Sequence, residues 1–126
     1  MSSLYETCTK EKTISYKQRL FIKTSLRQLG FNPKHNGFIL LQKAIIYAYK
    51  QDMITINLEE IYKYLAHKTN KPYKTIESDI RYSFYNINIK KLSQNYINIF
   101  QLEFSLEYLS IKNLINDFLD FINIPY

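Results

Sequence analysis

The chain has 126 residues, enough for a single domain that buries its own core, and 46% of them are hydrophobic, as is usual for a globular protein. Its net charge of +6 is unevenly distributed, because residues 1–91 carry sixteen Lys or Arg against seven Asp or Glu, whereas 92–126 carry one against four. A basic surface over the first three quarters favours a polyanionic partner, and the absence of any run of about twenty apolar residues excludes a membrane span.

The first predicted element is a helix that follows a polar segment. Residues 1–14 have no apolar run and are expected to form a flexible tail, which leaves 15–126 as a single domain. Ser15 and Gln18 have the spacing of a capping box, in which each side chain caps a backbone amide. A helix is therefore expected to begin there and to run up to Gly30, where a left-handed C-cap belongs.

A second apolar helix is expected over residues 37–50, after a loop over 31–36 that contains Pro33. Its apolar residues recur at helical spacing and should face the core: Phe38, Leu41, Ile45 and Ala48. These two helices would support the elements that follow.

Residues 57–71 have the pattern of the first half of a helix-turn-helix unit. Asn57 can cap a helix, with Glu60 as the reciprocal partner of a capping box. Apolar residues then follow at helical spacing: Leu58, Ile61 and Leu65. Small Ala66 is expected where the two helices touch, and a turn is predicted over 69–71 because asparagine tolerates left-handed dihedrals.

The second helix of the unit is expected over about residues 72–87. Pro72 suits the first helical position, where no backbone N–H is needed. The side chains expected to face the core are Tyr73, Ile76, Ile80, Phe84 and Ile87. At about 100° per residue, the opposite face and its flank hold the candidate DNA-binding side chains, to which the turn adds Lys71: Lys74, Thr75, Glu77, Ser78, Arg81, Tyr82 and Tyr85.

The chemistry of these side chains suits double-stranded DNA. Arg81 offers a two-pronged donor to guanine, serine and threonine can contact bases or phosphates, and tyrosine can reach phosphates or thymine methyl groups. Glu77 can accept from cytosine or orient Arg81 one turn away. We interpret the segment as a recognition helix that enters the major groove. An ordinary amphipathic surface helix is the alternative, which the pattern by itself does not separate from it.

The last quarter of the chain contains two different patterns. Residues 100–108 alternate strictly between apolar and polar side chains, as in a half-buried strand, so a winged helix-turn-helix with a strand near 96–108 is an alternative architecture. A last helix over about 110–123 has a broad apolar face: Ile111, Leu114, Ile115, Phe118, Leu119, Phe121 and Ile122. Asp117 and Asp120 stand opposite, and this acidic outer surface would repel DNA.

No group of residues in the sequence indicates a catalytic site or a metal site. Cys8 is the only cysteine, so an internal disulfide is impossible, and His35 and His67 have no further ligands at metal spacing. There is no glycine-rich phosphate loop and no arrangement of paired carboxylates or Ser and His that the spacing recommends. We therefore expect no enzyme activity, no cofactor and, without a targeting segment, a cytoplasmic protein.

Four stretches stand in the order and spacing of a known family. They are LGFNPKHNGFILLQKAIIYAY at 29–49, IYKYLAHKTN at 61–70, IESDIR at 76–81 and NINIKK at 86–91. With them, over about residues 17–123, the chain resembles the C-terminal DNA-binding domain of the master response regulator of sporulation initiation in endospore-forming bacteria. The ordered spacing is more specific than any single stretch.

The resemblance implies an all-α fold, a compact bundle of about six helices, in which residues 100–108 form an irregular connection. Glu77 and Arg81 match the family's polar pair, whereas Ser78 stands where the family has a second arginine and Asp79 where it has a small neutral residue. The family's target sequence is therefore not carried over. The family's regulators also have a receiver domain ahead of this module. The residues before the first expected helix are too few to form one, so we expect none in this sequence.

The resemblance further implies a sequence-specific transcriptional regulator, which we expect not to be gated by a phosphorylation domain of its own. The expected partners are double-stranded DNA, a second copy of the chain on tandem sites, and RNA polymerase, with no membrane. The second copy is expected because the apolar face of the last helix spans about 160°, against the ~100° that one core usually needs; a face lying wholly in the core is the alternative. The alternative function is a protein-interaction module that antagonises a full-length regulator without reading DNA.

Overall fold

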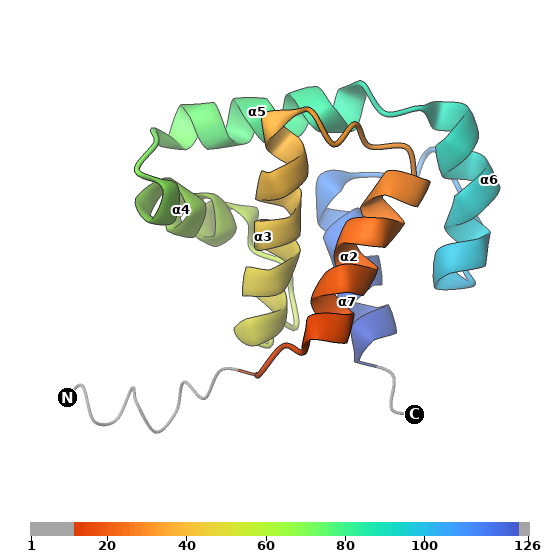
Figure 1. Ribbon diagram of the computed structural model, residues 1–126, viewed down its shortest axis with the longest axis horizontal. Helices are drawn as coiled ribbons and strands as arrows, with labels where there is room; N and C mark the ends of the chain where they lie inside the picture. Colours follow the sequence, from red (N-terminus) through yellow and green to blue (C-terminus); the bar gives the residue numbers. More distant parts are fainter. Residues whose placement is uncertain (1–11, 124–126) are drawn as a thin grey trace.

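The computed structural model describes residues 12–123, and this part of the chain is entirely helical apart from its connections. Its six helices (Figure 1) are α2 (Tyr16–Gln28), α3 (Asn36–Lys50), α4 (Leu58–Thr69), α5 (Tyr73–Tyr85), α6 (Ile89–Phe100) and α7 (Ile111–Ile122). No strand is present between residues 12 and 123. The expected all-α class with about six helices is confirmed, and most of the tail expected at 1–14 lies outside the described residues.

The strand that was the alternative near 96–108 does not form. Residues up to Phe100 belong to α6 instead, because buried side chains recur every fourth residue in that helix. Gln101 ends the helix in the left-handed conformation, with φ of 58°. In the irregular segment that follows, Phe104 packs against the core, whereas Leu102 is exposed. The alternating pattern therefore belongs to a connection, as the family resemblance implied.

The ends of α2 form as the sequence predicts. Ser15 Oγ accepts a hydrogen bond from the Gln18 N–H at 3.0 Å, and Gln18 Oε1 accepts one from the Ser15 N–H at 2.7 Å, which completes the capping box. Gly30 follows the helix with φ of 105°, and the Phe31 N–H donates to the Leu26 carbonyl oxygen at 3.1 Å. This is a Schellman ending, in which glycine adopts the left-handed conformation without strain.

Helix α3 is the centre of the domain. It contacts α2, α4, α5 and α7 (Figure 1). Its predicted inward residues are buried: Phe38, Leu41, Ile45 and Ala48. Since α5 packs against α3 and α4, the position of the second helix of the predicted helix-turn-helix is set by the core.

The broad apolar face of α7 is covered by the chain itself. Five of its side chains are buried: Leu114, Ile115, Phe118, Leu119 and Ile122. Ile111 and Phe121 are partly buried and pack against the same core. The width of this face therefore does not require a second copy of the chain to cover it.

The prediction that Asp117 and Asp120 both lie on an acidic outer surface of α7 is wrong for Asp117. Asp120 is exposed as expected. Asp117 is only 3% exposed. The hydroxyl of Tyr96 donates to one oxygen of its carboxyl group, and the hydroxyl of Tyr108 donates to the other at 3.2 Å. A carboxylate with two such donors can be buried at far lower cost than an unpartnered one. Helical periodicity could not reveal these partners, because they come from α6 and from the connection after it.

The buried carboxyl group predicts a pH-dependent stability. Burial raises the pKa of Asp117 above its ordinary value, even though the hydrogen bonds from Tyr96 and Tyr108 favour the charged form. Because the folded-state pKa is the higher one, the stabilisation is complete below the ordinary aspartate value and is lost as pH rises through the folded-state value. We therefore expect Asp117→Asn to reduce the fall in the free energy of unfolding between about pH 4 and pH 7.

Urea denaturation of both proteins across this range measures the effect. Asp120→Asn, on the exposed side of the same helix, is the matched control and should retain most of the wild-type slope. Identical pH profiles for wild type and Asp117→Asn would contradict the prediction.

Candidate nucleic-acid interface

Helices α4 and α5 form the predicted helix-turn-helix. Asn57 Oδ1 accepts a hydrogen bond from the Glu60 N–H at 3.1 Å, so Asn57 caps α4 as expected. The Glu60 side chain does not complete the capping box. Its carboxylate instead accepts a hydrogen bond from the Tyr47 hydroxyl of α3 at 3.1 Å, and this tertiary contact holds the start of α4 against α3.

The turn between the two helices has the predicted conformation. Asn70 is left-handed, with φ of 56° and ψ of 43°, and the Lys71 N–H donates to the Ala66 carbonyl oxygen at 3.1 Å. Pro72 is the N-cap of α5 rather than its first helical residue, because its ψ of 148° is extended. The helix itself begins one residue later and ends at Tyr85, so it is shorter than the expected 72–87.

The inner face of α5 packs as the apolar spacing predicts. Ile76 and Ile80 are fully buried, and Phe84 is nearly so. Tyr73 is partly buried, with its ring edge against Tyr62 of α4 at a centroid distance of 5.9 Å. One side of α5 is therefore fixed to the core, and the other side is left to face outward.

Helix α3 approaches the backbone of α5 at Gly37, in its first turn. A Cβ atom at this position would lie 2.2 Å from the Asp79 carbonyl oxygen and 2.4 Å from Ser83 Oγ. A side chain on residue 37 would therefore force the two helices apart. Ala66, the small residue expected where α4 and α5 touch, is a different position and is partly buried against the core. The glycine itself was visible in the sequence, but its spacing does not say which helix it meets.

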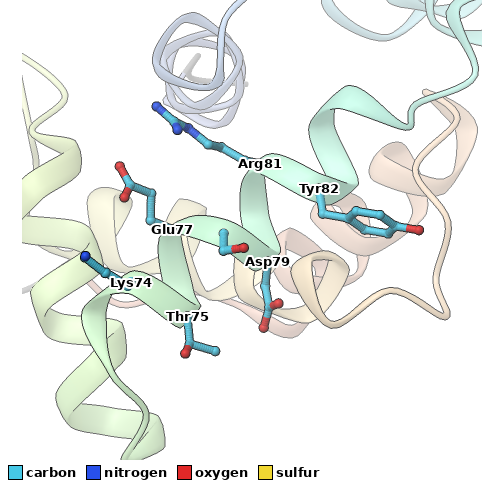
Figure 2. A pocket seen from close by; sticks show the side chains of 7 residues that line it. Lys74, Thr75, Glu77, Asp79, Arg81 and Tyr82 are labelled. Carbon is cyan, nitrogen blue, oxygen red and sulfur yellow. The ribbon is translucent and has the colours of Figure 1, made fainter.

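The outer face of α5 carries most of the predicted site residues (Figure 2). Lys74, Glu77 and Arg81 project along one edge, and Thr75, Asp79 and Tyr82 along the other. With Ser78 they surround an open hollow of about 700 Å³, and every residue that lines it belongs to α5. The hollow is therefore the space between side chains of one exposed helix, which suits a large partner better than a small ligand.

The two remaining candidate residues flank this surface. Lys71 is exposed in the turn before α5, and Tyr85 is 74% exposed at the end of the helix. Tyr82 is 58% exposed, and its ring lies 4.9 Å from the ring of His35, a residue to which the sequence assigned no role. All eight predicted residues thus lie on α5 or in the turn that leads into it.

The cations of this surface have no salt-bridge partner between residues 12 and 123. The ion pairs in that range join Lys12 to Asp52 at 2.8 Å and Lys63 to Glu59 at 3.1 Å. Glu77 therefore does not hold Arg81 in a salt bridge, which was one of its two expected roles. The guanidinium of Arg81 remains available to an external acceptor.

Tyr62 lies on the α4 side of this surface. Burial raises the pKa of its hydroxyl to about 12, the carboxylate of Glu77 adds to the rise, and the guanidinium of Arg81 opposes it. Tyr62 therefore stays neutral at physiological pH. It supports α5 through packing and adds no negative charge beneath the basic residues.

Other kinds of site are not evident in the described residues. Between residues 12 and 123, no group of three or more His, Cys, Asp or Glu side chains could hold a metal ion, and no helix is long and apolar enough to cross a membrane. Cys8 lies outside this range. Comparison with protein-family models, curated proteins and solved structures finds no match to the chain. What α5 can bind therefore has to follow from its own geometry and charge.

Proposed function

We propose that the protein is a sequence-specific regulator of transcription that places α5 in the major groove of double-stranded DNA. The observation that supports this best is the division of α5 into two faces. One is locked against α3 and α4, and the other is open and polar, with Lys74 and Arg81 outside any salt bridge among the described residues. A protruding helix with these properties is what groove entry requires.

The two cations are expected to have different roles. Lys74 lies in the first turn of α5, close to Lys71, where both can contact backbone phosphates and orient the helix. Arg81 lies two turns further along, where its guanidinium can pair with the O6 and N7 atoms of a guanine. Ser78 lies between them and can contact either a base or a phosphate. Phosphate contacts supply affinity, and base contacts supply the choice of sequence.

The family resemblance of residues 17–123 supports the same proposal, because its matching stretches include part of the turn and the middle of α5. Under this proposal the protein acts on tandem DNA sites as adjacent copies and meets RNA polymerase there. Pairing through α7 is not part of it, since the apolar face of α7 is already covered within the chain.

One observation favours a second candidate function. Two carboxylates, Glu77 and Asp79, stand on the outer part of α5, where they would approach DNA phosphates. A protein-interaction module that antagonises a full-length regulator tolerates such charges, whereas groove binding has to place each near a base donor or away from the backbone. The two candidates differ in whether the purified protein binds duplex DNA at all.

The sharpest test of the proposal compares Arg81→Ala with Lys74→Ala. Target sites are first selected from genomic DNA fragments by the purified protein. Arg81→Ala should weaken binding to a selected site by about 1–3 kcal/mol and relax the preference at one base pair, because a bidentate base contact is lost. Lys74→Ala should weaken binding to selected and random DNA by similar factors, because a phosphate contact carries no sequence information.

Fluorescence anisotropy with both kinds of DNA measures these effects, and circular dichroism checks that each variant keeps its helices. If Arg81→Ala loses the same affinity for selected and for random DNA, Arg81 contacts a phosphate rather than a base. If the wild-type protein binds no duplex even at low salt, DNA binding is refuted and the interaction module is favoured.

A further inference from the structure

A second basic surface lies away from the outer face of α5. Helix α3 stands between α2 and α4 (Figure 1), and the cleft along it has a volume of about 220 Å³. The seven residues that line the cleft come from these three helices, and none is acidic: Arg19, Lys43, Ile46, Tyr47, Lys50, Tyr64 and Lys68. We refer to them as the α2–α4 cleft.

The four cations of this cleft line one small pocket together, and no acidic residue lines it with them. Arg19, Lys43 and Lys68 are exposed, and Lys50 is partly buried. None of the four takes part in a salt bridge within residues 12–123. Cations that line the same cleft repel one another to some extent, and a bound anion would favour the arrangement by neutralising them.

The floor of the cleft is rigid. The rings of Tyr47 and Tyr64 stack at a centroid distance of 3.9 Å and an interplanar angle of 15°. The Tyr47 hydroxyl also donates to Glu60 at the start of α4. This stacking joins α3 to α4, so the two helices that carry Lys43, Lys50 and Lys68 are already held together without a ligand.

The cleft and the outer face of α5 do not share residues. Tyr62 turns towards Tyr73 of α5, whereas Tyr64, two residues along α4, turns towards Tyr47 of α3. Side chains two residues apart on an α-helix point about 200° apart around its axis. The cleft therefore lies on the side of α4 away from its contact with α5. A phosphate backbone in the cleft would therefore contact the protein at a place other than the outer face of α5.

We propose that the α2–α4 cleft binds phosphate groups of a nucleic-acid backbone at a place distinct from the groove that receives α5. A string of phosphates at regular spacing suits several cations spread over three helices, whereas a single small anion would leave most of them unpaired. The cleft needs no base contact, so it adds affinity to any sequence. This inference shares with the proposed function the premise of a nucleic-acid partner, but not the role of α5.

The first test measures binding to a short mixed-sequence DNA duplex at a series of salt concentrations. The variant Lys43→Gln/Lys68→Gln removes two exposed cations of the cleft at helical positions that glutamine tolerates. Lys17→Gln/Lys112→Gln, also exposed and outside the cleft, removes the same charge and is the matched control. The log-log slope should become shallower by about 1.8 in the cleft variant, at ~0.9 per phosphate contact, and should stay unchanged in the control.

Such a difference in slope means that wild-type affinity falls about twelvefold more than that of the cleft variant between about 50 and 200 mM salt. An unchanged slope in the cleft variant would overturn the inference. Equal changes in both variants would overturn it too, because they would reflect net charge alone.

The second test separates the cleft from α5 by NMR, with backbone amide signals followed during titration of the same duplex. In the variant Lys74→Gln/Arg81→Gln, the signals of Arg19 and Lys43 should still shift. If only α5 signals shift in the wild type, the cleft inference fails and the proposed function stands; if only cleft signals shift, the reverse holds. Shifts of the cleft signals with polyglutamate but not with the duplex would assign the cleft to an acidic protein and overturn the proposal.

Discussion

Replacing Phe118 by alanine should lower the free energy of unfolding by about 3–5 kcal/mol, the usual cost of removing a buried phenyl group. Phe118 is fully buried in α7. Its ring meets Phe100 of α6 edge-on at a centroid distance of 4.8 Å and Phe21 of α2 at 6.0 Å. The substitution would leave a cavity where α2, α6 and α7 meet.

The matched comparison for Phe118 is Phe121→Ala. Phe121 belongs to the same cluster and stacks on Phe21 at 5.0 Å, but it is only partly buried. Its loss should therefore be clearly smaller, because water can fill the space that it leaves. Urea denaturation at equilibrium measures both variants. A loss for Phe118→Ala no larger than that for Phe121→Ala would contradict the expectation that Phe118 is the more tightly packed of the two rings.

The second large effect is expected at Gly37, where the sign of the change is itself the test. Alanine normally stabilises a helix by about 1 kcal/mol relative to glycine. If Gly37 had no packing role, its replacement by alanine would therefore raise the free energy of unfolding. Here the new methyl group would lie 2.2 Å from a backbone oxygen of α5. We expect Gly37→Ala to destabilise the protein by about 1–3 kcal/mol, as overpacking usually does.

The same substitution should also impair DNA binding under the proposed function, because α3 can relieve the contact only by displacing α5. Asn36→Ala, at the neighbouring exposed position in the first turn of α3, is the control and should change neither property appreciably. Thermal denaturation and anisotropy with a selected DNA site measure the two effects. A Gly37→Ala variant more stable than wild type would contradict the close approach of α3 to α5.

The sequence predicts the helices and many of their ends because those features depend on local chemistry. The capping box of Ser15, the left-handed Gly30 and the left-handed Asn70 each involve residues a few positions apart. The inner and outer faces of α5 likewise follow from a period of 3.6 residues, so six of the eight candidate residues are exposed on α5 or in its leading turn, and Thr75 and Glu77 are partly buried at the edge.

Features that depend on residues distant in the sequence were not predictable in this way. Helical spacing predicts that Asp117 faces solvent, whereas in the structure Tyr96 and Tyr108 hydrogen-bond to its carboxyl group. Local spacing predicts that Glu60 is a capping residue, whereas its carboxylate accepts a hydrogen bond from the Tyr47 hydroxyl. In each case a local role was displaced by a tertiary partner. The α2–α4 cleft was missed for the same reason, since its four cations are spread over fifty residues of sequence.

The central position of α3 has a consequence for the time at which a newly made chain becomes competent. Helix α5 leaves the ribosome before α7, but α5 rests on α3, and α3 in turn packs against α7. The side of α3 that meets α7 stays open until α7 has been synthesised. The outer face of α5 is therefore expected to become rigid only when α7 docks, so that partial chains without α7 would not compete with folded molecules for a partner.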